Sequence, residues 1–255
     1  MGRRLRRAAA RGCQMRLGEA RAPEGLRLYA IGDVHGRDDL LAAVHARIAE
    51  DLTARPAEDH RIIHVGDYVD RGPATAAVIE RLSRLSRADE RVLCLRGNHE
   101  EMLLDFLADP IEAGPTFLAN RGAATLASYG VSGSPGLFFE RDIVALAEAF
   151  ASRLPASHRA FLQGLPYSAR FGDFFFCHAG IRPGVAIENQ DRFDLTWIRE
   201  GFLDSNADFG VVVVHGHTPA AEPEIMPNRI NIDTGAVFSG RLTCVVLEGN
   251  HYRFL

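Results

Sequence analysis

Short apolar runs alternate with amphipathic segments from residue 26 to the C-terminus, and this alternation most restricts the folds open to the chain. The runs "LRLYAIG", "RIIHVG" and "RVLCLRG" have the composition of β-strands, and between them lie the helical patterns "DDLLAAVHARIAEDL" and "ATAAVIERLSRL". In the first helical pattern, Leu41, Val44 and Ile48 fall on one face. Strands that alternate with helices in this way predict a mixed α/β domain.

The length and composition favour one domain. The chain has 255 residues, of which 47% are hydrophobic, enough to bury a full core. We therefore expect a single domain over residues 26–255. Residues 101–165 have a mainly helical pattern, and the C-terminal third returns to strand-like runs: "FGDFFFCHAG", "GVVVVHGHTP", "RINIDTG" and "LTCVVLEGNHYRFL".

The N-terminal segment differs in charge from the rest of the chain. Residues 1–21 carry seven arginines and one glutamate, although the whole chain has a net charge of −4. We expect residues 1–25 to form a basic, disordered tail. Contact of this tail with nucleic acid or an anionic surface is the alternative.

The cysteines and the apolar runs indicate a compartment. No run approaches the length of about 20 residues that spans a membrane, and the N-terminus lacks the apolar part of a secretory signal. Cys13, Cys94, Cys177 and Cys244 are widely spaced with no CxxC pair. Buried reduced thiols fit this spacing, so we expect a cytoplasmic protein.

Five of the predicted strands are followed directly by polar residues of the metal-ligand type. These residues are Asp33 and His35 in "GDVHG", Asp67 and Asp70 in "GDYVDRG", Asn98, His99 and Glu100 in "GNHE", His178 in "CHAG", and His215 and His217 in "HGHTP". Each motif alone is adequately explained as a turn or a buried histidine. Because loops beyond the carboxyl ends of the strands of an α/β sheet meet in one crevice, five such motifs together predict a shared site.

The residue types in these motifs indicate which ligand they bind. Carboxylate, amide and imidazole groups without thiolate suit Mn, Fe or Zn. Their number exceeds what one open metal site needs and favours two divalent ions. A pair of ions about 3.5–4 Å apart can activate water for attack on a phosphate ester.

The ordered set "GDVHG", "GDYVDRG", "RGNHE", "HAG" and "GHTP" resembles the signature of the metallophosphoesterases. Within that superfamily it resembles the phosphoprotein phosphatase branch, which includes bacterial and phage serine/threonine protein phosphatases. The resemblance implies a calcineurin-like fold, a central β-sandwich flanked by helices in α/β/β/α layers. It also implies a metal-ligand set: Asp33 and His35 for the first ion, Asp67 as the bridge, and Asn98, His178 and His217 for the second. His215 is left out of this set.

The resemblance also implies roles for residues beside the metals. His99 would be the general acid and Asp70 the carboxylate that orients it, while Arg71 and Asn98 would bind the substrate phosphate. "LTWIRE" resembles the segment that supplies a second phosphate-binding arginine and so nominates Arg199; a surface ion pair is an equally simple explanation of that residue. The expected mechanism is in-line attack by a metal-bridging hydroxide.

These expectations favour a serine/threonine protein phosphatase with two divalent ions, manganese first. The expected partner is a phosphoprotein or a phosphorylated small molecule, with no membrane and no nucleic acid beyond the tail. One alternative keeps the same dinuclear site and makes the substrate diadenosine tetraphosphate or another nucleotide. Another is a non-catalytic binding module.

Overall fold

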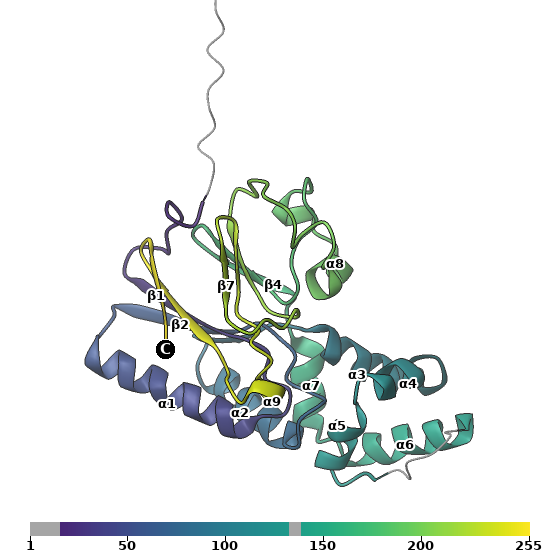
Figure 1. The fold of residues 1–255 in the computed structure, drawn as a ribbon. Helices are drawn as coiled ribbons and strands as arrows, with labels where there is room; N and C mark the ends of the chain where they lie inside the picture. The colour runs from purple at the N-terminus through teal and green to yellow at the C-terminus, as the bar shows by residue number, and fades with distance from the viewer. Residues whose placement is uncertain (1–15, 133–138) are drawn as a thin grey trace, which may run out of the picture.

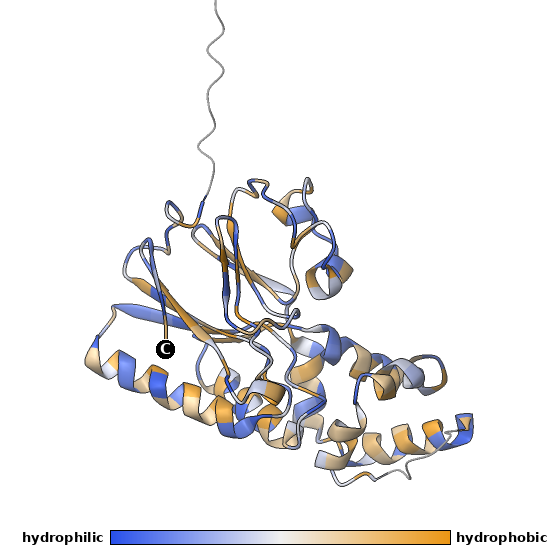
Figure 2. Cartoon of the chain, in the orientation of Figure 1, coloured by the Kyte–Doolittle hydropathy of each residue, from blue (hydrophilic) through white to orange (hydrophobic). Residues whose placement is uncertain are grey.

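The computed structural model describes residues 16–132 and 139–255. The first half of the domain alternates strands and helices as the sequence predicts (Figure 1). These elements are β1 (Leu26–Ile31), α1 (Asp38–Ala54), β2 (Asp59–His64), α2 (Thr75–Ala88) and β3 (Val92–Cys94). Helix α1 carries its buried residues Leu41, Val44 and Ile48 on the side that packs into the core. The hydropathy colours of Figure 2 show the same helix as a mixture of apolar and polar positions.

In its described residues, the segment that the sequence marks as helical contains five helices. They are α3 (Asn98–Ala108), α4 (Pro110–Ala119), α5 (Ala123–Ser128), α6 (Glu140–Arg153) and α7 (Ala156–Gly164). Their buried residues, among them Phe106, Phe117 and Phe150, join the same apolar cluster as those of α1 and α2. The helical region is therefore continuous with the core of the domain.

The C-terminal part is built mainly of strands, as expected. Its elements are β4 (Ser168–Phe171), β5 (Phe174–Cys177), a short 3-10 turn (Ile187–Asn189), α8 (Arg192–Trp197), β6 (Val212–His215), β7 (Glu224–Met226), β8 (Arg229–Asn231), α9 (Ala236–Ser239), β9 (Cys244–Glu248) and β10 (His251–Phe254). The last apolar run is a hairpin, because β9 and β10 pair antiparallel around the turn at Gly249.

Two five-stranded sheets form the centre of the fold. Their strand orders are β10-β9-β1-β2-β3 and β4-β5-β6-β8-β7, and each sheet contains parallel and antiparallel pairs. Side chains alternate along β5, so Phe174 and Phe176 pack between the sheets whereas Phe175 and Cys177 face the α8 side. Helices cover the outer faces (Figure 1), which confirms the expected sandwich flanked by helices.

The parallel strands place their carboxyl ends at one edge. β1 runs parallel to β2 and β2 to β3, and in the second sheet β5, β6 and β8 are parallel neighbours. The loops after these six strands carry the polar motifs of the sequence. The topology therefore brings those motifs to one edge of the sandwich.

Part of the segment expected to form the tail packs on the domain. Leu17, Ala20 and Ala22 are buried in the apolar cluster that lies between the two sheets. The backbone N–H of Leu17 donates to the Pro227 carbonyl. The many arginines of the segment favour a solvated tail, so its composition does not reveal that these apolar side chains are buried. The rest of the predicted tail, residues 1–15, and Cys13 lie outside the described residues.

Two sequence expectations concern the surroundings of the protein. In the described part of the chain, no helix combines the length and the hydropathy that crossing a membrane requires. Cys94, Cys177 and Cys244 are free, buried thiols.

Candidate metal centre

The loops at this edge adopt a backbone conformation that L-residues rarely take. The described non-glycine residues with positive φ are His35 (43°), Asp67 (54°), Asp70 (67°), Arg71 (65°), Arg121 (66°) and His217 (68°). All but one of them are residues that the sequence nominates for the site. Left-handed backbone at bulky residues costs free energy and persists where the surroundings impose it, often at functional sites.

Glu100 imposes the shape of the loop after β2. Its buried carboxylate accepts hydrogen bonds from the backbone N–H groups of Asp67 (2.9 Å), Tyr68 (2.7 Å), Val69 (3.2 Å) and Gly97 (2.9 Å). The sequence places Glu100 among the polar strand ends without giving it a role. Its position as the third residue of α3, where an acidic side chain reaches back to the N-cap backbone, is the signal that indicates this role.

Four donor atoms meet at one point of the edge. Nε2 of His178 lies 2.9 Å from Oδ1 of Asn98, 3.2 Å from Nδ1 of His217 and 3.3 Å from Oδ1 of Asp67. Nδ1 of His217 lies 3.0 Å from the same Asn98 oxygen. Ligands bound at about 2.0–2.2 Å around one tetrahedral or octahedral ion have this separation from one another.

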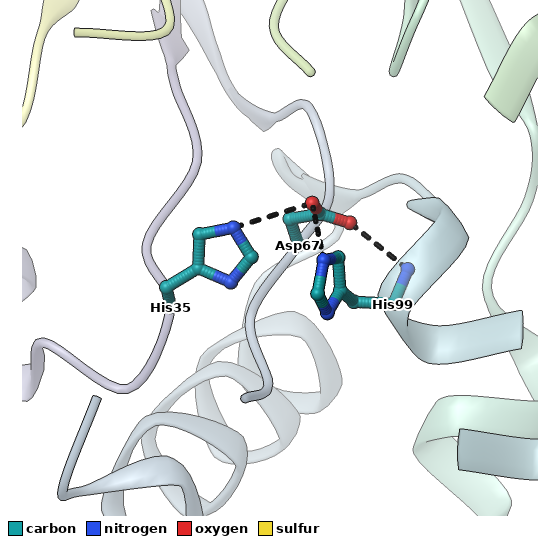
Figure 3. A group of neighbouring side chains, drawn as sticks. All are labelled: His35, Asp67 and His99. Carbon is teal, nitrogen blue, oxygen red and sulfur yellow. Dashed lines mark hydrogen bonds and ion pairs between the residues drawn. The ribbon is translucent and has the colours of Figure 1, made fainter. Parts of the chain in front are cut away.

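The other carboxylate oxygen of Asp67 faces a second group. Oδ2 lies 3.3 Å from Nε2 of His35 and 3.8 Å from Nε2 of His99. Figure 3 shows the two imidazoles on the Asp67 carboxylate, with the backbone N–H of His99 donating to Oδ1 at 3.1 Å. Asp67 therefore belongs to both groups that have the geometry of a metal site.

Two histidines of the donor groups are held in the tautomer that leaves Nε2 without a proton. Nδ1 of His178 donates to the Val65 carbonyl at 3.1 Å, and Nδ1 of His35 donates to the Val69 carbonyl at 2.7 Å. Burial lowers the pKa of both imidazoles well below the usual range, so each is neutral and directs the Nε2 lone pair at Asp67. Lone pairs that converge on a buried carboxylate fit a divalent cation, and carbonyls that fix the tautomer are typical of metal-bound histidines.

Asp33 supplies further negative charge at the same edge. Its Oδ2 accepts the backbone N–H of His217 at 3.1 Å. Burial raises the pKa of Asp33 well above its usual range, and the carboxylates of Asp233 and Asp67 raise it further. Asp233 follows β8, its carboxyl lies beside Asp33, and burial raises its pKa to about 6. The buried carboxylates of Asp33, Asp67 and Asp233 accept few hydrogen bonds, so bound cations would stabilise their negative charge.

Two glycines leave the space that these carboxylates fill. A Cβ at Gly97 would lie 2.2 Å from Oδ1 of Asp67, and a Cβ at Gly216 would lie 2.1 Å from Oδ1 of Asp33. No side chain fits at such distances. The glycines of "RGNHE" and "HGHTP" are therefore required by the position of the carboxylates.

His99 lies between a carboxylate and an arginine. Nδ1 of His99 is 2.7 Å from Oδ2 of Asp70, whose other oxygen accepts the hydroxyl of Thr125 at 2.6 Å. Arg71 donates to Nε2 of His99 at 3.0 Å and to Nε2 of His35 at 2.8 Å. Thr125 comes from α5, and no pattern in the sequence indicates its contact with the site.

The remaining nominated residues lie at the edge of the cluster or outside it. Arg199 is exposed, and its guanidinium donates to the His217 carbonyl at 3.4 Å. His215 packs its ring against Phe202, with 5.1 Å between ring centroids, and is not in either donor group. Cys177 is buried on the opposite face of β5 from the sheet interface, as its position next to His178 predicts.

Comparisons with known proteins agree with this geometry. A family model described as calcineurin-like phosphoesterase matches residues 26–240. Among curated proteins, the asymmetrical bis(5'-nucleosyl)-tetraphosphatase PrpE of Bacillus cereus is 28% identical over 84% of this chain and 87% of its own length. PrpE of Bacillus thuringiensis is 27% identical, with 84% and 88% covered.

Solved structures with this architecture have diverse names. A protein provisionally assigned as a diadenosine tetraphosphatase superposes with a TM-score of 0.63 at 19% identity, over 92% of this chain and 97% of that one. A cold-active protein tyrosine phosphatase of Shewanella superposes with a TM-score of 0.57 at 15% identity, over 94% and 84%. At such identities the likeness establishes the fold alone.

Proposed function

The chain belongs to the calcineurin-like phosphoesterase family, and from this premise we propose that it hydrolyses bis(5'-nucleosyl) tetraphosphates asymmetrically. The chain is a metal-dependent phosphoesterase. The observation that supports the reaction class is the pair of donor groups that share the Asp67 carboxylate. The observation that supports the substrate is the tetraphosphatase name of relatives that align over most of both chains.

The sequence favoured a serine/threonine protein phosphatase, with a dinucleotide hydrolase as the alternative. The comparisons support the superfamily and not the phosphatase branch, and the relatives favour the alternative. The cold-active protein tyrosine phosphatase is 15% identical to this chain, and that likeness supports the fold alone. We therefore place the dinucleotide substrate first.

Two divalent ions, when bound, would activate water and offset the charge of the phosphate. Asp33 and His35 would hold one ion, Asn98, His178 and His217 would hold the other, and the carboxylate of Asp67 would serve both. The donor set accepts Mn, Fe or Zn, with Mn the first choice.

The side chains around the ions bind the substrate and move a proton. The planar guanidinium of Arg71, which donates to the two imidazoles, would bind two phosphate oxygens in a bidentate geometry that lysine cannot reproduce. Arg199, at the rim, and the amide of Asn98 would contact further oxygens. His99 would carry a proton at Nε2 to the departing oxygen, while Asp70 holds Nδ1.

A side-by-side assay tests the substrate. The manganese-loaded chain is given diadenosine tetraphosphate and a phosphoserine/phosphothreonine peptide, and kcat/KM is measured for each. We expect the dinucleotide to be preferred by at least about tenfold, a difference of about 1.4 kcal/mol in transition-state binding. Preference for the peptide would reverse the proposal and restore the protein phosphatase expectation.

A further inference from the structure

A cleft of about 640 Å³ opens beside the metal centre and has a wall that the proposed chemistry does not use. Helix α8 contributes Phe193 and Trp197 to the cleft, and helices α3 and α4 contribute the carboxylates of Glu101, Asp105 and Glu112. The volume lies within the range of about 300–1,000 Å³ that is usual for small-molecule sites. The cleft is therefore large enough for part of a substrate.

The cleft adjoins the metal centre through Trp197, which lines the cleft and contacts the donor residue His217. The ring centroid of Trp197 lies 6.1 Å from that of His217, with the two rings nearly perpendicular at 79°. On the opposite wall, α3 starts with the site residues Asn98 and His99. The Thr196 hydroxyl donates to Glu101 at 2.9 Å and ties α8 to that helix. The part of a substrate that lies next to its metal-bound phosphate would therefore enter the cleft.

The aromatic wall offers a stacking surface. The rings of Phe193 and Trp197 lie 6.1 Å apart between centroids and are nearly parallel, at 18°. Phe193 is 65% exposed, so a ligand can reach its ring. Any nucleobase can stack on such rings, and each stacked base contributes about 1–3 kcal/mol, or about 5- to 150-fold in affinity.

The charges in the cleft favour a base over a further phosphate. Glu101, Asp105 and Glu112 present acceptors to the cleft and would repel phosphate oxygens. Two arginines also line the cleft, and both are engaged: Arg96 and Arg192 each place the guanidinium over the Tyr167 ring, 5.1 Å from its centroid. Arg96 also donates to the carbonyls of Leu162 (3.0 Å) and Gln163 (2.7 Å). Adenine carries an exocyclic amino group that donates two hydrogen bonds, which carboxylates can accept.

We infer that this cleft is a nucleobase subsite in which Phe193 and Trp197 stack on one base of the dinucleotide. The carboxylates of α3 and α4 accept hydrogen bonds from its exocyclic amino group. The inference rests on the proposed function, because the base is held to the metal centre through the phosphate chain of the substrate. It adds the residues that select a nucleotide over other phosphate esters.

The chain contains a single tryptophan, Trp197, which makes a direct test possible. The full chain loaded with manganese is titrated with adenosine, which has no phosphate, while tryptophan fluorescence is recorded. We expect saturable quenching and a Kd about 5- to 100-fold higher for Phe193→Ala. Phe139→Ala is the matched control, because Phe139 is 63% exposed, has the same side chain and does not line the cleft. Inosine, which lacks the amino group, should bind more weakly than adenosine.

The outcomes separate this inference from the proposed function. Quenching by adenosine that depends on Phe193 supports the subsite even if the dinucleotide is not hydrolysed, in which case only the proposed function fails. Hydrolysis of the dinucleotide without quenching by adenosine overturns the subsite and leaves the function intact. Equal quenching by ribose 5-phosphate, or quenching by an arginine-containing peptide and not by adenosine, also overturns it.

Discussion

The carboxylate of Asp70 lies 2.7 Å from Nδ1 of His99, and this contact determines that Nε2 is the nitrogen that faces the metal centre. Thr125 holds the carboxylate in turn, since its hydroxyl donates to Asp70 at 2.6 Å and accepts the Asp70 backbone N–H at 2.8 Å. The chain thus positions an imidazole whose Nε2, which accepts a hydrogen bond from Arg71 at 3.0 Å, would face the leaving group in the proposed reaction. How much this imidazole matters depends on the leaving group, which gives a first prediction.

His99→Asn should slow different substrates to different degrees. An alkyl phosphomonoester releases a strongly basic alkoxide, so loss of the proton donor should reduce kcat by about 10²- to 10⁴-fold. A nucleotide leaves as a phosphate with a pKa near 6, so the loss on diadenosine tetraphosphate should be about tenfold or less. The measurement is kcat for both substrates, with metal content as the control. Equal losses would show that His99 acts through the metal centre and not as an acid.

Asp70→Asn should lower activity without removing the metals. The amide can no longer fix Nδ1 as the donor nitrogen of His99, so we expect a loss in kcat that is parallel to that of His99→Asn and not additive with it. Thr125→Val should also lower kcat, but by a smaller factor. Kinetics of the double variant His99→Asn/Asp70→Asn provide the check, and losses that simply multiply would separate Asp70 from His99.

The sequence contains enough information to predict most of this site, for a physical reason. Each nominated ligand lies one to four residues after the end of a strand, and parallel strands bring their ends together, so local patterns determine long-range proximity. The alternation of Phe174 and Phe176 against Phe175 and Cys177 determines the two faces of the second sheet in the same way.

Other features depend on contacts that no local pattern encodes. Thr125 reaches Asp70 from a helix distant in sequence, and the carboxylate of Asp233 approaches Asp33 only because β8 pairs with β6. The edge strands β4 and β7 are short and partly exposed, so they lack the apolar runs of the central strands. Leu17 and its neighbours pack on the sandwich from within an arginine-rich segment, where composition alone favours a tail.

Removal of divalent ions should destabilise the protein. The converging lone pairs and carboxylates around Asp67 repel one another without a cation. At a hundred times Kd, a bound ion contributes about 2.7 kcal/mol, which for a chain of this size corresponds to about 5–10 °C in Tm. Thermal unfolding with manganese and with a chelator gives the shift. In Asp67→Asn, which removes the shared carboxylate charge, the shift should shrink markedly, and an unchanged shift would place the ions elsewhere.

Gly97→Ala should disrupt the centre although it adds a single methyl group. The new Cβ would overlap Oδ1 of Asp67, so the loop or the carboxylate must move, which we expect to lower the free energy of unfolding by about 2 kcal/mol and to weaken metal binding. Gly164→Ala is the matched control, because no atom lies within 4 Å of its added Cβ and the residue ends a helix. Denaturant unfolding and metal titration of both variants test this. Equal behaviour would refute the steric argument.

A buried pair of histidines that belongs to neither donor group should make stability depend on pH. Nε2 of His45 lies 2.9 Å from Nε2 of His64, and burial lowers their pKa values to about 4 and about 3. The unfolded chain binds protons at these histidines near pH 6.5 and the folded chain does not, so stability falls as pH decreases below 6.5 toward 4.

Between pH 7.5 and pH 5 we expect this pair to reduce the free energy of unfolding by about 1–3 kcal/mol. Urea unfolding at both values should show a smaller difference for His45→Leu than for the parent chain. His251→Gln changes an exposed histidine in β10 and serves as the control. An identical pH dependence in His45→Leu would rule the pair out as its source.

The products formed from diadenosine tetraphosphate by the manganese-loaded chain test the central claim most directly. Separation of the nucleotides by ion-exchange chromatography should give ATP and AMP in equal amounts, with the reaction abolished in Asp67→Asn. Two molecules of ADP would contradict the asymmetric reaction. Absence of cleavage by protein that binds two ions per chain would contradict the claim that this metal centre acts on dinucleoside tetraphosphates.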